Sequence, residues 1–238
     1  MKKFIYALVP LMGILLLGSC TSKTYNVKVT FPDDSFNGKM AVITASHDGS
    51  VIDSALIEEM TAVFEGEVIE PMLALVSCER TRGQLILEPG EITIDLQQPG
   101  KISLGSGTSL NTELGALVEK YNQLMDEITN YEGEDENEFY KTVWTPKFTE
   151  EIGSIFKANS NNDVGMMALM YLSNYGEADA LDAFFEQAGK KVSSRGPIQK
   201  IIKQRQALKQ TAEGMMFTDF TIEDSDGQSV SFSDYIGK

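Results

Sequence analysis

Residues 72–96 read Met72-Leu73-Ala74-Leu75-Val76-Ser77-Cys78-Glu79-Arg80-Thr81-Arg82-Gly83-Gln84-Leu85-Ile86-Leu87-Glu88-Pro89-Gly90-Glu91-Ile92-Thr93-Ile94-Asp95-Leu96. Short apolar runs alternate there with polar residues and a Pro-Gly pair, a pattern typical of short strands joined by turns. Comparable runs occupy most of the chain from Tyr25 to about Leu104, namely Tyr25–Phe31, Met40–Ser46, Val51–Ile57, Ala62–Val68, Met72–Cys78, Gln84–Glu88 and Ile92–Leu96. Turns are marked by Asn37-Gly38, Asp48-Gly49 and Pro89-Gly90. This regular spacing predicts an antiparallel β sandwich or barrel.

The pattern becomes helical after the predicted strands. Apolar residues recur at helical intervals at Leu110, Leu114, Leu117, Val118, Tyr121, Leu124, Met125 and Ile128. A second helical stretch runs from about Asn137 to Lys157, and Pro146 should break or kink it. Two short helices are expected over Val164–Tyr171 and 178–188, and Pro197 suits the first turn of a last helix that buries Ile198, Ile201, Ile202 and Leu208. The expected fold class is α+β, with the β sandwich first and a helical block second.

The amino terminus has the features of a secretory signal. Lys2 and Lys3 precede an apolar stretch over Phe4–Leu17, which is shorter than the roughly 20 residues that span a bilayer. The segment Leu17-Gly18-Ser19-Cys20 resembles the lipobox of bacterial lipoproteins. That resemblance implies lipidation of Cys20 and a stable membrane anchor. An ordinary secretory cleavage is the alternative. Because Thr21 rather than Asp follows Cys20, we expect the periplasmic face of the outer membrane.

The net charge excludes one class of partner. The chain has 35 acidic and 20 basic residues, which gives a formal charge of −15. An acidic surface of this kind repels nucleic acid, so no nucleic-acid partner is expected. The same surface favours solubility in a body that only its lipid holds near a membrane. With 42% hydrophobic residues the chain can bury one sizeable core or two small ones.

Residues 217–238 contain a hairpin signal, because Asp226-Gly227 is flanked by Thr221-Ile222 and Val230-Ser231-Phe232. With Asp219-Phe220, Ser233-Asp234-Tyr235 and Gly237-Lys238, the segment resembles the opening of membrane-anchored thioredoxin-like thiol-disulfide oxidoreductases of the peroxiredoxin and cytochrome-maturation type. Thr218 stands where that family usually has proline. The resemblance implies that a Cys-x-x-Cys motif would follow Lys238, in a domain that needs no metal or organic cofactor.

Only two cysteines are present in the chain, Cys20 and Cys78. Thiol-disulfide exchange needs one thiol that attacks and a second that resolves the mixed disulfide. Cys20 is assigned to lipidation, so the chain alone is predicted to be inactive, and no catalytic residue is assigned within it.

The predicted β region also resembles a known domain. Ile52-Asp53-Ser54-Ala55, Phe64-Glu65-Gly66, Leu87-Glu88-Pro89-Gly90 and Gly107-Thr108-Ser109-Leu110-Asn111 are similar to a small all-β domain of unknown function that often precedes thioredoxin-like domains in bacterial lipoproteins. The predicted division is a lipoprotein signal peptide at 1–19, a β-sandwich domain at 20–106, a helical block at 107–212 and the truncated start of a thioredoxin-like domain at 213–238.

Other candidate residues have simpler interpretations. Cys78 ends an apolar run and is expected to be buried, with a reactive lone thiol as the alternative. His47 is the single histidine and lies in a predicted turn, which excludes the usual zinc sites built on several histidines. Met166, Met167 and Met170 could bind a soft metal but are more typical of a helix core.

Three loops gave weaker signals. The acidic residues 132–138 and the segment Asp224–Gly227 both lack the full ligand pattern of a calcium loop. Gly105-Ser106-Gly107 is a weak phosphate-loop signal and is better interpreted as a joint between domains. No metal site and no cofactor are therefore predicted.

Two functional hypotheses follow. In the first, the chain is the lipid-anchored, periplasm-facing recognition and anchoring module of a thiol-disulfide oxidoreductase that acts on periplasmic client proteins. In the second, it is a standalone, non-enzymatic lipoprotein that binds a partner protein or a cell-envelope ligand. A hydrolase is a minor alternative, because no spacing singles out a catalytic pair among the 35 acidic residues.

Overall fold

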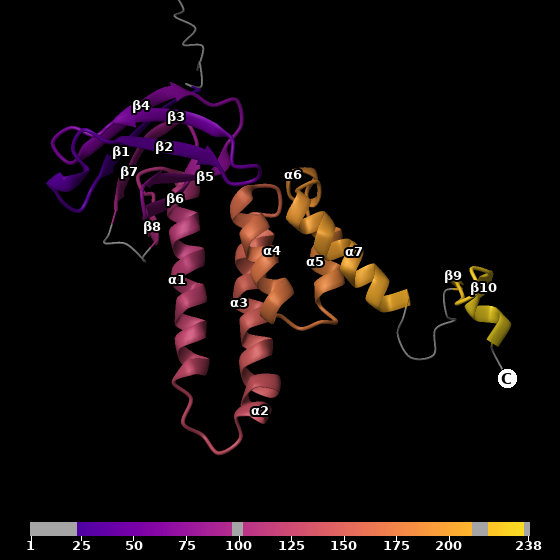
Figure 1. The fold of residues 1–238 in the computed structure, drawn as a ribbon. Coiled ribbons are helices and arrows are strands. Elements are labelled where there is room, and N and C mark those ends of the chain that lie inside the picture. The colour runs from indigo at the N-terminus through magenta and orange to yellow at the C-terminus, as the bar shows by residue number, and fades with distance from the viewer. Residues whose placement is uncertain (1–22, 97–101, 211–218, 236–238) are drawn as a thin grey trace, which may run out of the picture.

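The computed structural model describes residues 23–96, 102–210 and 219–235. Figure 1 shows a β domain, a group of helices beneath it and a small hairpin that stands apart from both. The predicted signal peptide and Cys20 lie outside the described residues. Within the described ranges no helix is both long enough and apolar enough to cross a bilayer.

Two sheets form the β domain. The three-stranded sheet has the order β4-β1-β7, with β4 at Thr61–Glu67, β1 at Thr24–Thr30 and β7 at Gly90–Asp95. The five-stranded sheet has the order β3-β2-β5-β6-β8, with β3 at Val51–Leu56, β2 at Met40–Ala45, β5 at Met72–Cys78, β6 at Thr81–Leu87 and β8 at Ile102–Leu104. A short 3-10 helix, η1 at Asp34–Phe36, lies between β1 and β2.

The predicted all-antiparallel pairing is wrong in two places. β7 pairs with β1 in parallel, and β8 pairs with β6 in parallel. The chain passes from the five-stranded sheet to the three-stranded sheet between β6 and β7, and it returns to the five-stranded sheet at β8. The three-residue strand β8 was also missed, since a run that short has no measurable alternation.

Strands β5 and β6 contribute side chains to a core on each face of their sheet, which explains the apolar runs Met72–Val76 and Leu85–Leu87. Val76 and Leu85 point into the sandwich core that both sheets share. Leu73 and Ile86, which are opposite each other in the β5–β6 ladder, belong instead to the core of the helices. The five-stranded sheet is therefore the middle layer of three.

The helices follow the predicted positions closely. They are α1 at Ser109–Thr129, α2 at Glu136–Phe139, a π-helical segment η2 at Tyr140–Trp144, α3 at Thr145–Ala158, α4 at Asp163–Tyr175, α5 at Leu181–Gln187, α6 at Lys190–Ser193 and α7 at Gly196–Gln210. The expected interruption at Pro146 is confirmed, because Pro146 lies in the first turn of α3 directly after η2. The N–H of Thr145 reaches back to the carbonyl of Tyr140, so the π turn adjusts the hydrogen bonding before the proline.

Burial along α7 differs from the prediction at its end. Ile198 is fully buried, but the side chain of Leu208 is 69% exposed. In these last turns Arg205 and Lys209 pair with Asp182 of α5, so charged side chains rather than Leu208 lie toward the neighbouring helix. The helical core instead centres on Trp144, whose side chain is fully buried and whose Nε1–H donates to the carbonyl of Leu124 at 2.6 Å.

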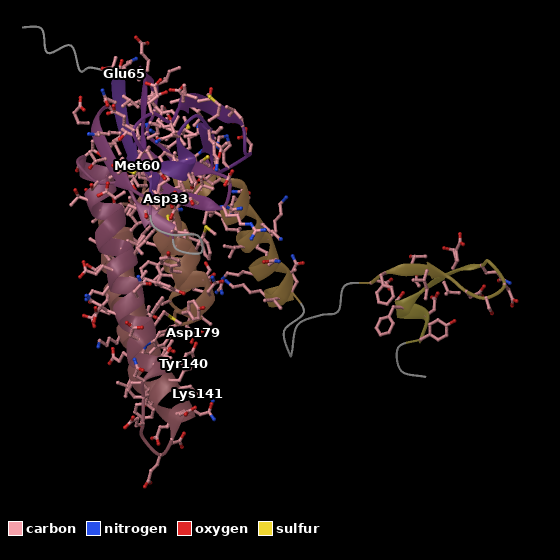
Figure 2. The ribbon with its side chains drawn as sticks, turned by 60° about the vertical axis from the view of Figure 1, so that its left-hand side comes forward. Asp33, Met60, Glu65, Tyr140, Lys141 and Asp179 are labelled. Atoms are coloured by element: carbon pink, nitrogen blue, oxygen red, sulfur yellow. The ribbon has the colours of Figure 1, made fainter. Side chains whose placement is uncertain are left out.

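The turn between β3 and β4 has an unusual backbone. Glu58 and Thr61 exchange two backbone hydrogen bonds around Glu59 and Met60, whose φ angles are +49° and +60°. A two-residue hairpin turn of this shape normally contains Asn-Gly, because side chains are strained at positive φ. The N–H of Met60 donates to Asn37 Oδ1 at 2.7 Å, which helps to hold this conformation. Figure 2 shows Met60 at the surface of the β domain.

Met60→Gly should therefore stabilise the fold. Relief of the positive-φ strain exceeds the added backbone entropy of glycine, so we expect a gain of about 0.5–1 kcal/mol in the free energy of unfolding. Thermal unfolding followed by circular dichroism should show a midpoint about 2–4 °C higher. The control is Met40→Gly, an exposed methionine within β2, which should destabilise because glycine weakens a strand. Equal losses in both variants would contradict the assignment of strain to Met60.

Candidate functional site at the junction of sheet and helices

Asp163 joins the β domain to the helices. It lies at the start of α4 with its side chain only 6% exposed. Its Oδ2 accepts the N–H of Leu73 at 2.6 Å, and its Oδ1 is 2.8 Å from Nη2 of Arg195. Strand β2 ends at Ala45, so its ladder to β5 does not extend to this N–H. The carboxylate thus completes the end of a strand and pairs with a largely buried arginine at the same time.

Asn111 performs a similar role on β6. Strand β8 pairs with β6 only as far as Gln84, so Ile86 has no strand neighbour on that side. Asn111 Oδ1 accepts the N–H of Ile86 at 2.9 Å, and its Nδ2 donates to the carbonyl of Ile86 at 2.7 Å. Glu88 Oε1 accepts the N–H groups of Leu110 and Asn111, which caps the first turn of α1. Two helices therefore finish the two central strands with side chains.

A cavity of about 150 Å³ lies beside Asp163. Its lining is mostly apolar and comes from four separate segments: the β2–β3 turn, β5, α4 and the start of α7 with the residues before it. The residues are Ser46, His47, Leu73, Asp163, Met166, Met170, Arg195 and Pro197. His47 is exposed at the mouth, while Met166 is 9% exposed. The lining thus includes both the single histidine and two methionines of α4.

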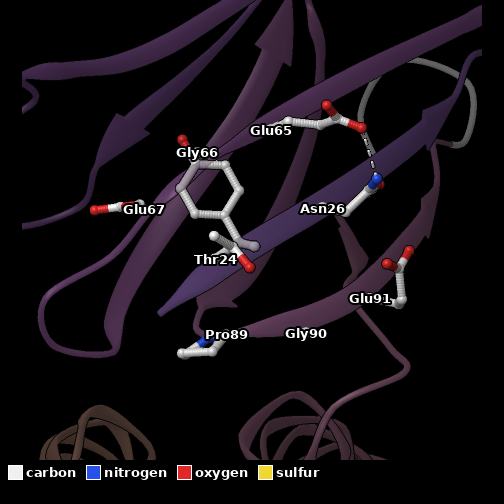
Figure 3. A pocket seen from close by; sticks show the side chains of 9 residues that line it. Thr24, Asn26, Glu65, Gly66, Glu67, Pro89, Gly90 and Glu91 are labelled. Carbon is white, nitrogen blue, oxygen red and sulfur yellow. Dashed lines mark hydrogen bonds between the residues drawn. The ribbon is translucent and has the colours of Figure 1, made fainter. Parts of the chain in front are cut away.

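A second hollow is open and polar. It has a volume of about 690 Å³ and lies at the ends of β1, β4 and β7. Figure 3 shows Glu65, Glu67 and Glu91 around it, with Asn26 bonded to Glu65 at 3.0 Å. The Tyr25 hydroxyl lies so close to Gly66 that a Cβ there would be 2.5 Å from the oxygen, which explains the glycine. Three carboxylates and few donors would favour a cationic or amide-rich ligand.

The Tyr25 hydroxyl donates to Asp53 Oδ2 at 3.1 Å. This hydrogen bond joins β1 of the three-stranded sheet to β3 of the five-stranded sheet. Burial, followed by the charge and the hydrogen bond of Asp53, raises the pKa of Tyr25 to about 12. The neutral phenol is therefore the form that the fold stabilises. Because this pKa is above the unfolded value of about 10, the contribution is complete below pH 10 and is lost as the pH rises to 12.

Between pH 10 and pH 12 we therefore expect a stability loss that Tyr25→Phe lacks. The wild type should show a steeper fall in urea midpoint over this range than the variant. The difference between the two pH profiles reports on Tyr25 alone, because the other seven tyrosines are present in both proteins. One of these is Tyr121, and burial raises its pKa to about 12 as well. Parallel pH profiles for the two proteins would show that the Tyr25–Asp53 bond is not maintained in solution.

The remaining predicted residues mostly have structural roles. Cys78 is buried, and desolvation raises the pKa of its thiol, so the reactive-thiol alternative is not supported. The N–H groups of Gly105 and Ser106 donate to the carbonyls of Gln84 and Thr93, so both already have backbone acceptors. Asp224 Oδ1 accepts the N–H groups of Asp226 and Gln228 within the predicted hairpin turn, and Asp135 caps α2 within the acidic loop. In the described part of the chain no group of three or more His, Cys, Asp or Glu side chains could hold a metal ion.

The predicted hairpin forms, with β9 at Thr221–Glu223, β10 at Ser229–Ser231 and a 3-10 turn η3 at Phe232–Tyr235. Asp219 accepts the N–H and the hydroxyl of Ser233, which closes its base. Phe220 and Phe232 stack with ring centroids 5.3 Å apart. Both rings remain about half exposed, as do Ile222 and Tyr235.

The β domain matches a known family. Residues 25–114 match the domain of unknown function DUF4369. The DUF4369 match extends from β1 into α1, so it includes Glu88, Asn111 and the contact with Ile86. It confirms the predicted all-β domain of unknown function. No curated protein and no solved structure matches the chain. The comparisons give no evidence for a thioredoxin-like or oxidoreductase family.

Sequence reasoning missed Asp163, Asn111 and Arg195. Of the three, only Asn111 was considered from the sequence, and only as part of a family resemblance. One available signal was that Asp163 and Asn111 are both short polar residues in the first turn of an apolar helix. That signal does not say which distant backbone group they reach.

Proposed function

We propose that this chain is the lipid-anchored, periplasm-facing anchoring and recognition module of a thiol-disulfide oxidoreductase. In this proposal Cys20 carries the lipid, and the DUF4369 domain with its helices forms a rigid body next to the membrane. The redox dithiol belongs to a thioredoxin-like domain that follows the hairpin, and the module alone has no activity.

The exposed apolar face of the hairpin is the observation that supports this proposal. Phe220, Ile222, Phe232 and Tyr235 are 53%, 57%, 44% and 59% exposed. A two-stranded ribbon is marginally stable by itself, and a cluster of exposed apolar side chains favours a surface that binds another element. A central sheet that continues from this hairpin would cover that face, as the resemblance of residues 217–238 to the start of a thioredoxin-like domain implies.

The open hollow at β1, β4 and β7 favours the second candidate function, a non-enzymatic lipoprotein. It is the larger of the two hollows described above, it is lined by Glu65, Glu67 and Glu91, and β1 begins only a few residues after Cys20. A basic segment of a partner protein would suit its charge. This candidate needs no further domain.

The mass of the protein purified from its native membrane separates the two. The proposed module predicts a lipidated species that is heavier by about 100 or more residues, the size of a small domain, and that reduces insulin disulfides. Limited proteolysis of that species should leave residues 219–235 intact, because the following domain covers them. A lipidated protein without insulin reductase activity that ends at Lys238 would overturn the proposal and leave the binding lipoprotein.

A further inference from the structure

Three potential ligands of a soft metal ion line the junction cavity. His47 comes from the turn between β2 and β3, and Met166 and Met170 come from α4. The two methionines are four residues apart, so they share one face of the helix. Met167, which follows directly in sequence, is directed elsewhere: its sulfur is 3.9 Å from Nε2 of Gln84 on β6. Only two of the three methionines considered from the sequence therefore meet the histidine.

This donor set has a clear metal preference. Thioether sulfur and imidazole nitrogen are ligands for monovalent copper, whereas magnesium and calcium need oxygen ligands. The mostly apolar wall formed with Leu73 and Pro197 would limit competition from water. Methionine has three rotatable bonds, so both sulfur atoms can close around an ion within a cavity of about 150 Å³.

The charges around the cavity also suit a monovalent cation. The positive charge of Arg195 is compensated by Asp163 at 2.8 Å. Asp48 Oδ2 lies 3.3 Å from Nε2 of His47, so a carboxylate stands beside the imidazole.

We propose that the junction cavity binds Cu(I) through His47, Met166 and Met170. The site does not depend on the proposed function, because it needs neither a dithiol nor a further domain. It would give the DUF4369 domain and its helices a joint ligand, since neither part contains all three donors. Binding would also fasten the β2–β3 turn to α4.

Silver(I) is the first probe, because it is a soft monovalent ion without redox chemistry. The full chain is labelled with ¹³C at the methionine methyl groups, in a Cys20→Ser, Cys78→Ala background that removes competing thiols. We expect the methyl signals of Met166 and Met170 to shift together and to saturate at a single equivalent, while the signal of Met167 stays in place. Variants at each position assign the signals.

Affinity for Cu(I) is then measured by competition with bicinchoninate under anaerobic conditions. Met166→Leu, Met170→Leu and His47→Gln should each weaken binding by about tenfold or more. The matched control is Met167→Leu, which removes an equally buried methionine of the same helix and should leave affinity unchanged. Leucine conserves the volume of methionine, so all these variants should fold, which thermal unfolding verifies.

Several results would overturn the proposal. The first is that the protein withdraws no Cu(I) from the chelator. The second is that the Met167 signal shifts as much as those of Met166 and Met170. The third is that Met167→Leu weakens Cu(I) binding as much as the other variants do. A shift of the methionine signals with unchanged affinity in His47→Gln would remove the histidine from the site. None of these results bears on the membrane mass measurement, so the two proposals fail separately.

Discussion

Asp163→Ala is expected to lower the free energy of unfolding by about 3–5 kcal/mol, because it breaks a buried ion pair by removing one partner. The variant leaves Arg195, whose side chain is 27% exposed, without its counter-charge. It also leaves the N–H of Leu73 without an acceptor in the apolar layer between sheet and helices. Urea unfolding followed by circular dichroism should show a much lower midpoint.

Glu70→Ala is the matched control for this variant. Glu70 and Lys191 also join the β domain to the helices, but their side chains are 65% and 43% exposed. Loss of an exposed ion pair should cost less than about 1 kcal/mol. The double variant Asp163→Ala, Arg195→Leu should recover part of the loss, because no uncompensated charge remains. If Asp163→Ala and Glu70→Ala had similar effects, Asp163 would not be the main link between the two parts.

Asn111→Leu should destabilise the protein by about 3 kcal/mol or more, because it leaves two buried backbone groups unpaired at about 1–3 kcal/mol each. These groups are the N–H and the carbonyl of Ile86, which only the side-chain amide of Asn111 reaches on this edge among the described residues. Leucine has a similar volume, so the loss reflects hydrogen bonds rather than a cavity. Amide exchange at Ile86 should also become faster.

Asn122→Leu provides the comparison on the same helix. Asn122 is exposed on α1, and surface substitutions of this kind usually change stability by less than about 0.5 kcal/mol. Because leucine has a higher helix propensity than asparagine, a small gain is the expected sign. A large loss in both variants would mean that the effect is not specific to Asn111, and a small loss in both would mean that the amide of Asn111 does not complete the strand.

Much of the fold could be predicted from local sequence. The alternating runs gave seven of the eight strands of the β domain, and Asn37-Gly38, Asp48-Gly49 and Pro89-Gly90 lie at connections with positive glycine φ angles. The apolar spacing from Leu110 gave α1, and Pro197 lies at the start of α7. These features depend on neighbours within a few residues, which a single sequence displays directly.

The candidate site could be predicted only as separate residues. His47 was correctly interpreted as a turn residue, and the buried positions of Met166 and Met167 as helix core, yet nothing in the spacing relates His47 to an α4 methionine more than 100 positions away. The exposure of Leu208 was missed for the same reason, since the periodic pattern does not show that Arg205 and Lys209 of α7 reach Asp182 on α5.

The sequence by itself determined most of the strands, helices and turns, and the apolar runs within the central strands β5 and β6. Only the tertiary structure decided that β7 and β8 pair in parallel and that Asp163 and Asn111 complete the strand ends. The physical reason is that backbone hydrogen bonding must be satisfied everywhere in a buried layer. Which groups remain unpaired depends on where neighbouring strands end, and therefore on contacts between residues far apart in the chain.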